Sequence, residues 1–505
     1  MSPVTARVIS DWSSVPKSVS RCLEEITAVL FHFRRGQSLR TITFAGILYL
    51  TSICSFGQVK CGPPTYACAS NSSDVVQLPN PLPYMGDPLH GVNTRWTEDI
   101  LNGGYIRVTD ADDDPYGQNS SFVLGDAGDT DWINGDSTLF LVQRVGGLAI
   151  VKTWNKATRM SGRTPITFLD SVIFDPGNPN VLWERSGLKI YKNLITDRST
   201  WAIQRTLAFD FGADQNCLPN FGKVTWTGIW GISEDGSALT SAYSNTGAQE
   251  TGVYIAVYYP RLDKCRVLQT ETGQVTGDFG PIGPVTTDKR FTVHDAGQTP
   301  NHEYATVASN FCFDAEGNES QCTLFLIWET RTLNLRECGS WPVESPYCDG
   351  HGAAGFNGWA KGKHYVMHPY DSPDDLGISL MPFSLGPLDE HGSWPQIRGE
   401  PDQLPAFTFT TWVGNPQGPN TVPFQNELVG FDSNGSGEVY REGFNWNSGL
   451  SSNFSCQNGI GRVSPHGNFA LVTSDGEGSF GSQTGPTCDL ASGNCRCDII
   501  AIPLR

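Results

Sequence analysis

The stretch GRVSPHGNFALVTS at residues 461–474 decides the fold of this chain. It contains a short strand, a tight turn at Ser464-Pro465-His466-Gly467 and a second strand of alternating character. The segment DIIAIPL at 498–504 supplies a further apolar strand near the end of the sequence. Together these segments predict an antiparallel sheet made of consecutive short strands.

The same order of strand, polar turn and strand recurs along the chain, clearly in some places and loosely in others. Further copies lie at 131–143, 171–184, 226–244 with 253–260, 291–308 with 323–329, 351–368 with 378–383, and 391–412 with 426–432. Seven such units, each completed by one or two outer strands, predict an all-β fold, a seven-bladed β-propeller. A two-sheet sandwich and a right-handed β-helix are the alternatives. The sandwich would need a domain break, and the β-helix would need a shorter, stricter period.

Composition agrees with a large all-β protein and bounds its partners. The 55 Gly and 32 Pro are spread among polar turn residues, and 14 Trp and 26 Phe supply bulky packing groups. The net charge is −18; without residues 1–57 it is about −21, because 28 Lys and Arg then face 49 Asp and Glu. Such a surface repels phosphate backbones and anionic lipids, so we expect neither nucleic acid nor a membrane surface as the partner.

Residues 34–57 have the layout of a secretory signal. A basic stretch precedes an apolar run from Thr41 to about Ile53, and small residues frame a cleavage point before Gln58. The run is too short to span a bilayer comfortably, so no membrane span is expected once the signal is removed. We therefore divide the chain into an N-terminal extension and signal peptide (1–57), an extended Pro- and Ser-rich lead-in (58–97) and the propeller (98–505). The mature protein is expected to be secreted, either extracellular or periplasmic.

The cysteines fit export to an oxidising compartment. Twelve remain after the signal, several in close pairs separated by turn residues. Proximity in sequence predicts five disulfides, and elimination predicts a sixth: Cys61–Cys68, Cys217–Cys265, Cys312–Cys322, Cys338–Cys348, Cys488–Cys495 and, by elimination, Cys456–Cys497. A structural zinc site near Cys488, Cys495 and Cys497 is the rival interpretation. It is the weaker one, because no CxxC pair exists in the chain.

The turns carry a family resemblance. Ser464-Pro465-His466-Gly467 and Ser233-Glu234-Asp235-Gly236 resemble the SPDG turns of TolB-like and WD40-like propellers. The mature chain also resembles a group of secreted bacterial proteins without an assigned activity, through segments at Cys61–Pro64, Arg107–Ala111, Asp389–Trp394 and Thr473–Asp475. This resemblance implies the fold and export, not a function. The likeness to oligogalacturonate lyases is confined to the blade pattern, because no metal-binding motif of theirs can be matched here.

Three histidines are the sharpest chemical feature. His294, His351 and His391 lie on the expected inner strands of three consecutive units. If their heights match, the imidazoles could bind one divalent metal (Zn, Mn or Ca) with a position open for substrate. Neighbouring carboxylates could orient the rings or complete the site: Asp295, Asp389 and Glu390. Histidines at such positions more often form hydrogen bonds within their own strands or channel.

These features leave three functions open. The first is a binding propeller that holds an extracellular polysaccharide or a surface protein at the channel mouth, with Trp226 and Trp394 as stacking faces. The second is a metal-assisted polysaccharide lyase or hydrolase that uses the three histidines. The third is a structural envelope protein. The sequence does not decide whether the protein is an enzyme, and tryptophans in blades more often pack in the core.

Overall fold

We describe the fold from a computed structural model. It describes residues 75–79, 81–101, 103–125, 132–214, 216–217, 225–233, 235–244, 252–279, 290–298, 304–331, 333–337, 389–393, 406–411, 420, 424–431, 439–448, 456, 459–488 and 494–504. Nearly all of the regular structure in these residues is β-strand, with two short 3₁₀ turns, η1 (Ala111–Asp113) and η4 (Gly476–Gly478).

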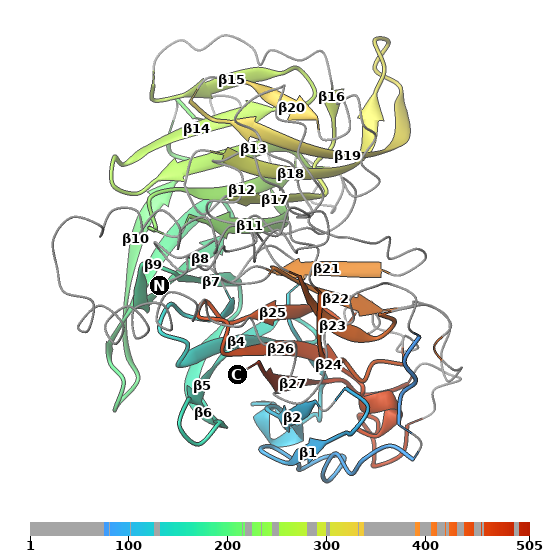
Figure 1. Cartoon of the computed structure of the whole chain (residues 1–505). Helices are drawn as coiled ribbons and strands as arrows, with labels where there is room; N and C mark the ends of the chain where they lie inside the picture. Colours follow the sequence, from blue (N-terminus) through green and yellow to red (C-terminus); the bar gives the residue numbers. More distant parts are fainter. Residues whose placement is uncertain are drawn as a thin grey trace, which may run out of the picture. The chain divides into compact units, whose positions relative to one another are not determined.

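The first three sheets follow one another along the chain, and neighbouring strands within each sheet are antiparallel (Figure 1). The first sheet has the order β3 (Phe122–Val123), β4 (Leu139–Arg144), β5 (Leu148–Asn155) and β6 (Met160–Phe168). The second is β7 (Ser171–Asp175), β8 (Asn178–Ser186), β9 (Lys189–Asp197) and β10 (Ala202–Asp210). The third is β11 (Thr225–Ile232), β12 (Leu239–Ser244), β13 (Gly252–Tyr259), β14 (Lys264–Gln269) and β15 (Gln274–Gly277).

Three more sheets complete the described part of the chain. In the fourth, β16 (Arg290–Phe291) and β17 (Asp295–Gln298) both pair with β18 (Tyr304–Phe313), followed by β19 (Glu319–Glu329) and β20 (Leu335–Glu337). The fifth is β21 (Asp389–Ser393), β22 (Ala406–Thr411), β23 (Glu427–Phe431) and β24 (Val439–Phe444). The sixth, here called the closing sheet, is β25 (Gly461–Val463), β26 (Phe469–Ser474), β27 (Asp498–Pro503), β2 (Gly104–Arg107) and β1 (Arg95–Thr97).

The turns between first and second strands share one geometry. In the closing sheet, Ser464 Oγ accepts the backbone N–H groups of Asn468 and Phe469 at 2.9 and 3.2 Å, and Gly467 takes a φ of +61°. In the third sheet, Ser233 Oγ accepts the N–H of Ala238 at 3.0 Å, and Gly236 takes a φ of +66°. Glycine adopts this left-handed conformation at little cost, which explains why the Ser-x-x-Gly pattern repeats.

The first strands of neighbouring sheets approach one another closely. A Cβ on Gly231 of β11 would lie 2.7 Å from the backbone nitrogen of Gln298 in β17, so this position requires glycine. Likewise, Ser393 of β21 accepts a hydrogen bond from Val463 of β25 at 3.0 Å. The first strands therefore form the inner edge, and the later strands lie progressively further out.

Among the described residues, hydrophobic clusters join five pairs of neighbouring sheets. The cluster between the second and third sheets includes Trp183 and Tyr258, and the one between the third and fourth includes Ile255 and Trp328. Other clusters join the first sheet to the second, the fifth to the closing sheet, and the closing sheet back to the first. This successive packing of four- and five-stranded sheets, with the last described sheet packed on the first, is a β-propeller and confirms the predicted fold. Six expected units coincide with described sheets; the unit at 351–368 lies outside the described residues.

The two ends of the described chain meet in the closing sheet. Figure 1 shows β1 and β2, in blue, next to the red β27. Ile106 of β2 pairs with Ala501 of β27, and Arg107 pairs with Ile500. Earlier residues also contact the late part of the chain. The Gln77 side chain donates to the Asn420 backbone oxygen at 2.8 Å, and the Asn420 side chain donates to the Val76 backbone oxygen at 2.7 Å. Residues from both ends of the described chain therefore build the last blade.

Asp475 forms hydrogen bonds to the segment that follows β24 and to the segment that follows β26. Its carboxylate is fully buried and accepts the backbone N–H groups of Ser448 and Glu477 at 2.9 and 3.0 Å, as well as the Ser448 hydroxyl. Burial raises the pKa of Asp475 to about 6, against the lowering effect of the Ser448 hydrogen bonds. Burial, together with the nearby Asp475 charge, raises the pKa of Glu477 to about 8. The late Thr473–Asp475 segment noted in the sequence thus has a structural role.

Removing Ile106 should show how much stability the closure contributes. Ile106 is buried between the closing sheet and the first sheet, so Ile106→Ala should lower the free energy of unfolding by about 2–5 kcal/mol. Leu169, which is 77% exposed, provides the control: Leu169→Ala should change it by less than about 0.5 kcal/mol. Urea unfolding measures the free energy of unfolding of both variants. An equal loss in the two variants would contradict the closure of the propeller by β2 and β27.

Asp475→Asn should remove one pH-dependent contribution to stability. The pKa of Asp475 in the folded protein, about 6, lies above the ordinary value of 3.8. Its contribution is therefore fully present below pH 3.8 and is lost as the pH rises through about 6, a change of up to about 3 kcal/mol. The difference in unfolding free energy between wild type and variant should thus fall between pH 4 and pH 7. A difference that stays constant over this range would show that the carboxyl does not titrate there.

Candidate ligand-binding pocket

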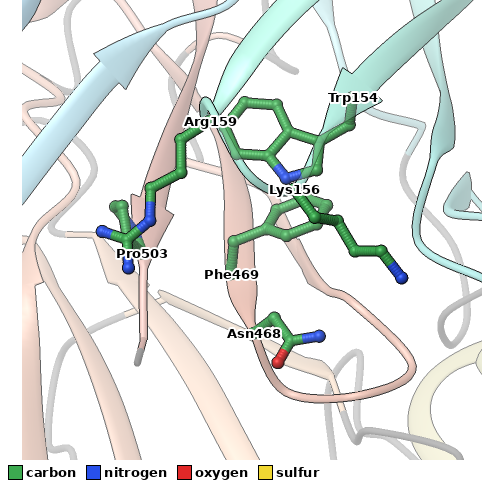
Figure 2. Close-up of a pocket in the computed structure, with 6 residues that line it drawn as sticks. All are labelled: Trp154, Lys156, Arg159, Asn468, Phe469 and Pro503. Carbon is green, nitrogen blue, oxygen red and sulfur yellow. The ribbon is translucent and has the colours of Figure 1, made fainter.

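A pocket of about 290 Å³ lies where the closing sheet meets the first sheet (Figure 2). Its lining consists of two aromatic residues, two cations, an amide and a proline: Trp154, Phe469, Lys156, Arg159, Asn468 and Pro503. Trp154 is the penultimate residue of β5, the third strand of the first sheet, whereas Phe469 begins β26, the second strand of the closing sheet. The pocket therefore lies between blades, away from the inner strands.

Two turns position the polar lining. Asn155 Oδ1 accepts the backbone N–H groups of Ala157 and Thr158, both at 3.0 Å, which shapes the turn from β5 to β6. Arg159 follows with a φ of +52°. On the other side, the Ser464 turn places Asn468 directly before Phe469. Each turn thus brings polar groups to the edge of an aromatic side chain.

The aromatic pair forms the apolar wall. Trp154 and Phe469 are 4% and 1% exposed, and their ring centroids lie 4.8 Å apart at an angle of 36°. In Figure 2 the two rings lie one above the other, and the Lys156 and Arg159 side chains extend on either side of them. Because both rings are almost completely buried, only a small part of each reaches the pocket, and core packing holds that part in place.

The rim is positively charged, although the protein as a whole is acidic. Lys156 and Arg159 are exposed, and Lys156 donates to the backbone oxygen of Asp136 at 2.9 Å. Arg95 of β1 adds a third cation nearby, because it donates to the Arg159 carbonyl oxygen at 3.0 Å. The Asp136 carboxylate forms an ion pair with Arg198 at 3.3 Å. A local positive field of this kind attracts an anionic ligand.

The histidines predicted to bind metal are only partly described. His294 lies between β16 and β17 and is half-buried, whereas His391 lies within β21 and its side chain is outside the described part. His351 and Trp394 lie outside the described residues. The backbones of Asp295, Asp389, Glu390 and Trp226 belong to inner strands, but their side chains are not described. The three-histidine site therefore stays a prediction.

Three cysteine pairs are described. The structure joins Cys217 to Cys265, Cys456 to Cys497 and Cys488 to Cys495, with Cα–Cα distances of 6.0, 5.9 and 4.9 Å. These distances suit disulfides. The pairings match three of the six expected from the sequence. The other expected pairs involve side chains outside the described part of the chain.

Two carboxylates flank the first of these disulfides. Asp214 and Asp278 bring oxygen atoms within 4.8 Å of the sulfurs of Cys217 and Cys265, a spacing also found in metal sites. Here the sulfurs are bonded to each other, and the carboxylates brace the disulfide. Asp278 accepts the Cys265 N–H at 2.9 Å, and Asp214 accepts the Cys217 N–H at 3.1 Å.

The sequence analysis did not single out this pocket. The run Trp154-Asn155-Lys156 followed by Arg159 places an aromatic residue and two cations around one turn, which is a usable signal. Its partner Phe469 lies far away in the sequence, and only the packing of the closing sheet on the first sheet brings them together. Trp446, another tryptophan of the late sheets, is fully buried and packs against Tyr105 and Phe444.

Solved β-propellers are among the structures similar to this chain. An oligogalacturonate lyase from Vibrio parahaemolyticus has a TM-score of 0.39 and 10% identity, covering 86% of this chain and 99% of that one. TolB from Acinetobacter baumannii has a TM-score of 0.29 and 10% identity, and the match covers 76% of this chain and 64% of TolB. The Neurospora crassa Pan2 WD40 domain has a TM-score of 0.33 and 8% identity, and the match covers 75% of this chain and 89% of that domain. No protein-family model and no curated protein match the sequence.

One negative finding concerns membranes. Within the residues that the structure describes, no helix is long and apolar enough to cross a bilayer.

Peptide mapping under non-reducing conditions tests the cysteine pairs. We expect linked peptides for Cys217–Cys265, Cys456–Cys497 and Cys488–Cys495, each separating after reduction. The pairing around Cys495 and Cys497 is the informative part, since neighbouring cysteines exchange partners easily. A peptide linking Cys456 to Cys488 would contradict the structure described here.

Proposed function

We propose that this β-propeller is an extracellular binding protein that recognises an acidic carbohydrate in the pocket between β5 and β26. The pocket supports this most directly, because it combines an aromatic pair with the cations Lys156 and Arg159. Its volume of about 290 Å³ lies just below the usual range for ligand pockets, about 300–1,000 Å³, and suits a ligand no larger than one sugar ring. A signal-like segment and three disulfides support an extracellular setting.

The chemistry of the lining favours a charged sugar over a neutral one. Aromatic groups contact the apolar face of a pyranose, and the Asn468 amide offers a donor and an acceptor for hydroxyl groups. Lys156 and Arg159 supply charge-assisted hydrogen bonds to a carboxylate or sulfate. A neutral sugar would leave both cations without that partner. We also propose a second binding mode, in which a surface protein binds at the channel mouth and stacks against Trp226 and Trp394.

A metal-assisted lyase or hydrolase is a second candidate function. His294 lies at the inner edge of the fourth sheet, and His391 lies on β21, the first strand of the fifth. The segment that contains His351 connects these sheets in the sequence. Three imidazoles in this order fit one divalent metal if their rings converge. Metal analysis of the purified protein tests this proposal: about one equivalent in wild type and none in His391→Ala supports it, and no metal in either contradicts it.

Neutralising the pocket cations should weaken acidic-sugar binding. The double variant Lys156→Gln, Arg159→Gln loses two charge-assisted contacts, so its affinity for a uronate oligosaccharide should fall at least about tenfold. Isothermal titration measures this affinity, with a neutral oligosaccharide of the same length as the reference ligand. The neutral sugar should bind weakly to wild type and variant alike.

A matched variant controls for the change in net charge. Lys189 and Arg261 are also exposed but lie away from the pocket, so Lys189→Gln, Arg261→Gln removes the same charge elsewhere. This control should keep wild-type affinity. Equal losses in both double variants would show that only the overall field matters. Unchanged affinity in the pocket variant would exclude this pocket as the binding site.

A further inference from the structure

Arg496 is fixed in the interior by the disulfides on either side of it. Its neighbours Cys495 and Cys497 are bonded to Cys488 and Cys456, respectively. The Arg496 backbone N–H also donates to the Gly481 oxygen at 2.8 Å. The side chain is completely buried, with 0% exposure. An arginine that is held at both neighbouring residues cannot turn its guanidinium group out to water without local unfolding.

Only part of this guanidinium group has a partner. Arg496 Nη2 donates to Asp498 Oδ1 at 2.7 Å. Among the residues that the structure describes, Nε and Nη1 have no hydrogen-bond partner. These two nitrogens carry three of the five N–H donors of an arginine. Buried donors of a charged group are costly to leave without a partner.

Asp498 does not neutralise both arginines around it. Arg107, which is also fully buried, donates to Asp498 Oδ2 at 2.5 Å, and the Thr109 hydroxyl donates to Oδ1 at 3.0 Å. Three more donors of Arg107 are taken by the backbone oxygens of Thr109, Asp87 and Pro88. Two buried guanidinium groups therefore share one carboxylate.

Asp110, a carboxylate that interacts electrostatically with Arg107 and Asp498, already has partners of its own. Asp110 accepts the backbone N–H groups of Val92 and Asp112 at 2.9 and 3.0 Å and forms an ion pair with Arg163 at 3.3 Å. It therefore has no oxygen directed at Arg496 in the described contacts. Arg107 and Arg496 together carry one positive charge more than Asp498 can balance, and the donors without a partner belong to Arg496.

From this arrangement we propose that Arg496 forms a buried binding site for a small monovalent anion of halide size. A water molecule would satisfy the N–H donors but would leave the charge unbalanced, whereas an anion does both. The complete burial of the side chain favours a small ion over a phosphate or a sugar acid. The site precedes the first residue of β27, and the carbohydrate pocket lies at the last residue of that strand. The two sites can therefore be tested separately.

Thermal unfolding of the full chain tests this proposal. At constant pH and ionic strength, replacing gluconate by chloride or bromide should raise the midpoint by a few degrees and reach saturation, because the ion binds only the folded state. Arg496→Met should abolish the dependence on the anion. Arg261→Met, which removes an exposed arginine, should retain it. A midpoint that is the same in all three salts would overturn the proposal.

Bromide provides a readout that does not depend on a variant folding. Crystals of the wild-type protein grown in bromide should show an anomalous scattering peak within hydrogen-bonding distance of Arg496 Nε and Nη1. If Arg496→Met fails to fold, this peak alone shows whether an anion is bound at Arg496. Density at that position without anomalous signal would identify water and would contradict the anion site. Either result leaves the carbohydrate proposal unaffected.

Discussion

The pairing of β2 with β27 is the constraint on which the rest of the structure depends. Two backbone register pairs, Ile106 with Ala501 and Arg107 with Ile500, attach the early part of the chain to its last sheet. This pairing places Ile106 in the cluster between the closing sheet and the first sheet. A propeller closed in this way cannot release its first or last blade without losing both interfaces. The Trp154 and Phe469 pocket lies at the same interface.

Buried charge specifies the register of that pairing. Arg107 reaches Asp498 only in the observed alignment, and a shift of one residue would move its side chain to the opposite face of the sheet. Buried ion pairs often add little net stability compared with apolar groups, yet breaking one partner is costly. We therefore interpret Arg107 and Asp498 as residues that favour one register over its alternatives. The unequal number of arginines and carboxylates there is what leaves Arg496 with free donors.

Local patterns in the sequence predicted most of the fold, because propeller blades are built from neighbouring strands. The Ser464 and Ser233 turns were recognisable, since their hydrogen bonds and left-handed glycines involve residues close together in the chain. The Trp154 pocket was not predictable in this way. It requires knowing that the closing sheet packs on the first sheet, which no short motif encodes. The heights of His294, His351 and His391 depend on side chains beyond those described, so their convergence stays a prediction.

In the function proposed above, an acidic sugar binds between two blades and not at the inner strands. The most direct test is a crystal structure of the protein with a bound uronate oligosaccharide. We expect the sugar ring to lie against Trp154 and Phe469, with its carboxylate between Lys156 and Arg159. A sugar located instead beside His294 and His391, with the pocket filled only by solvent, would contradict it.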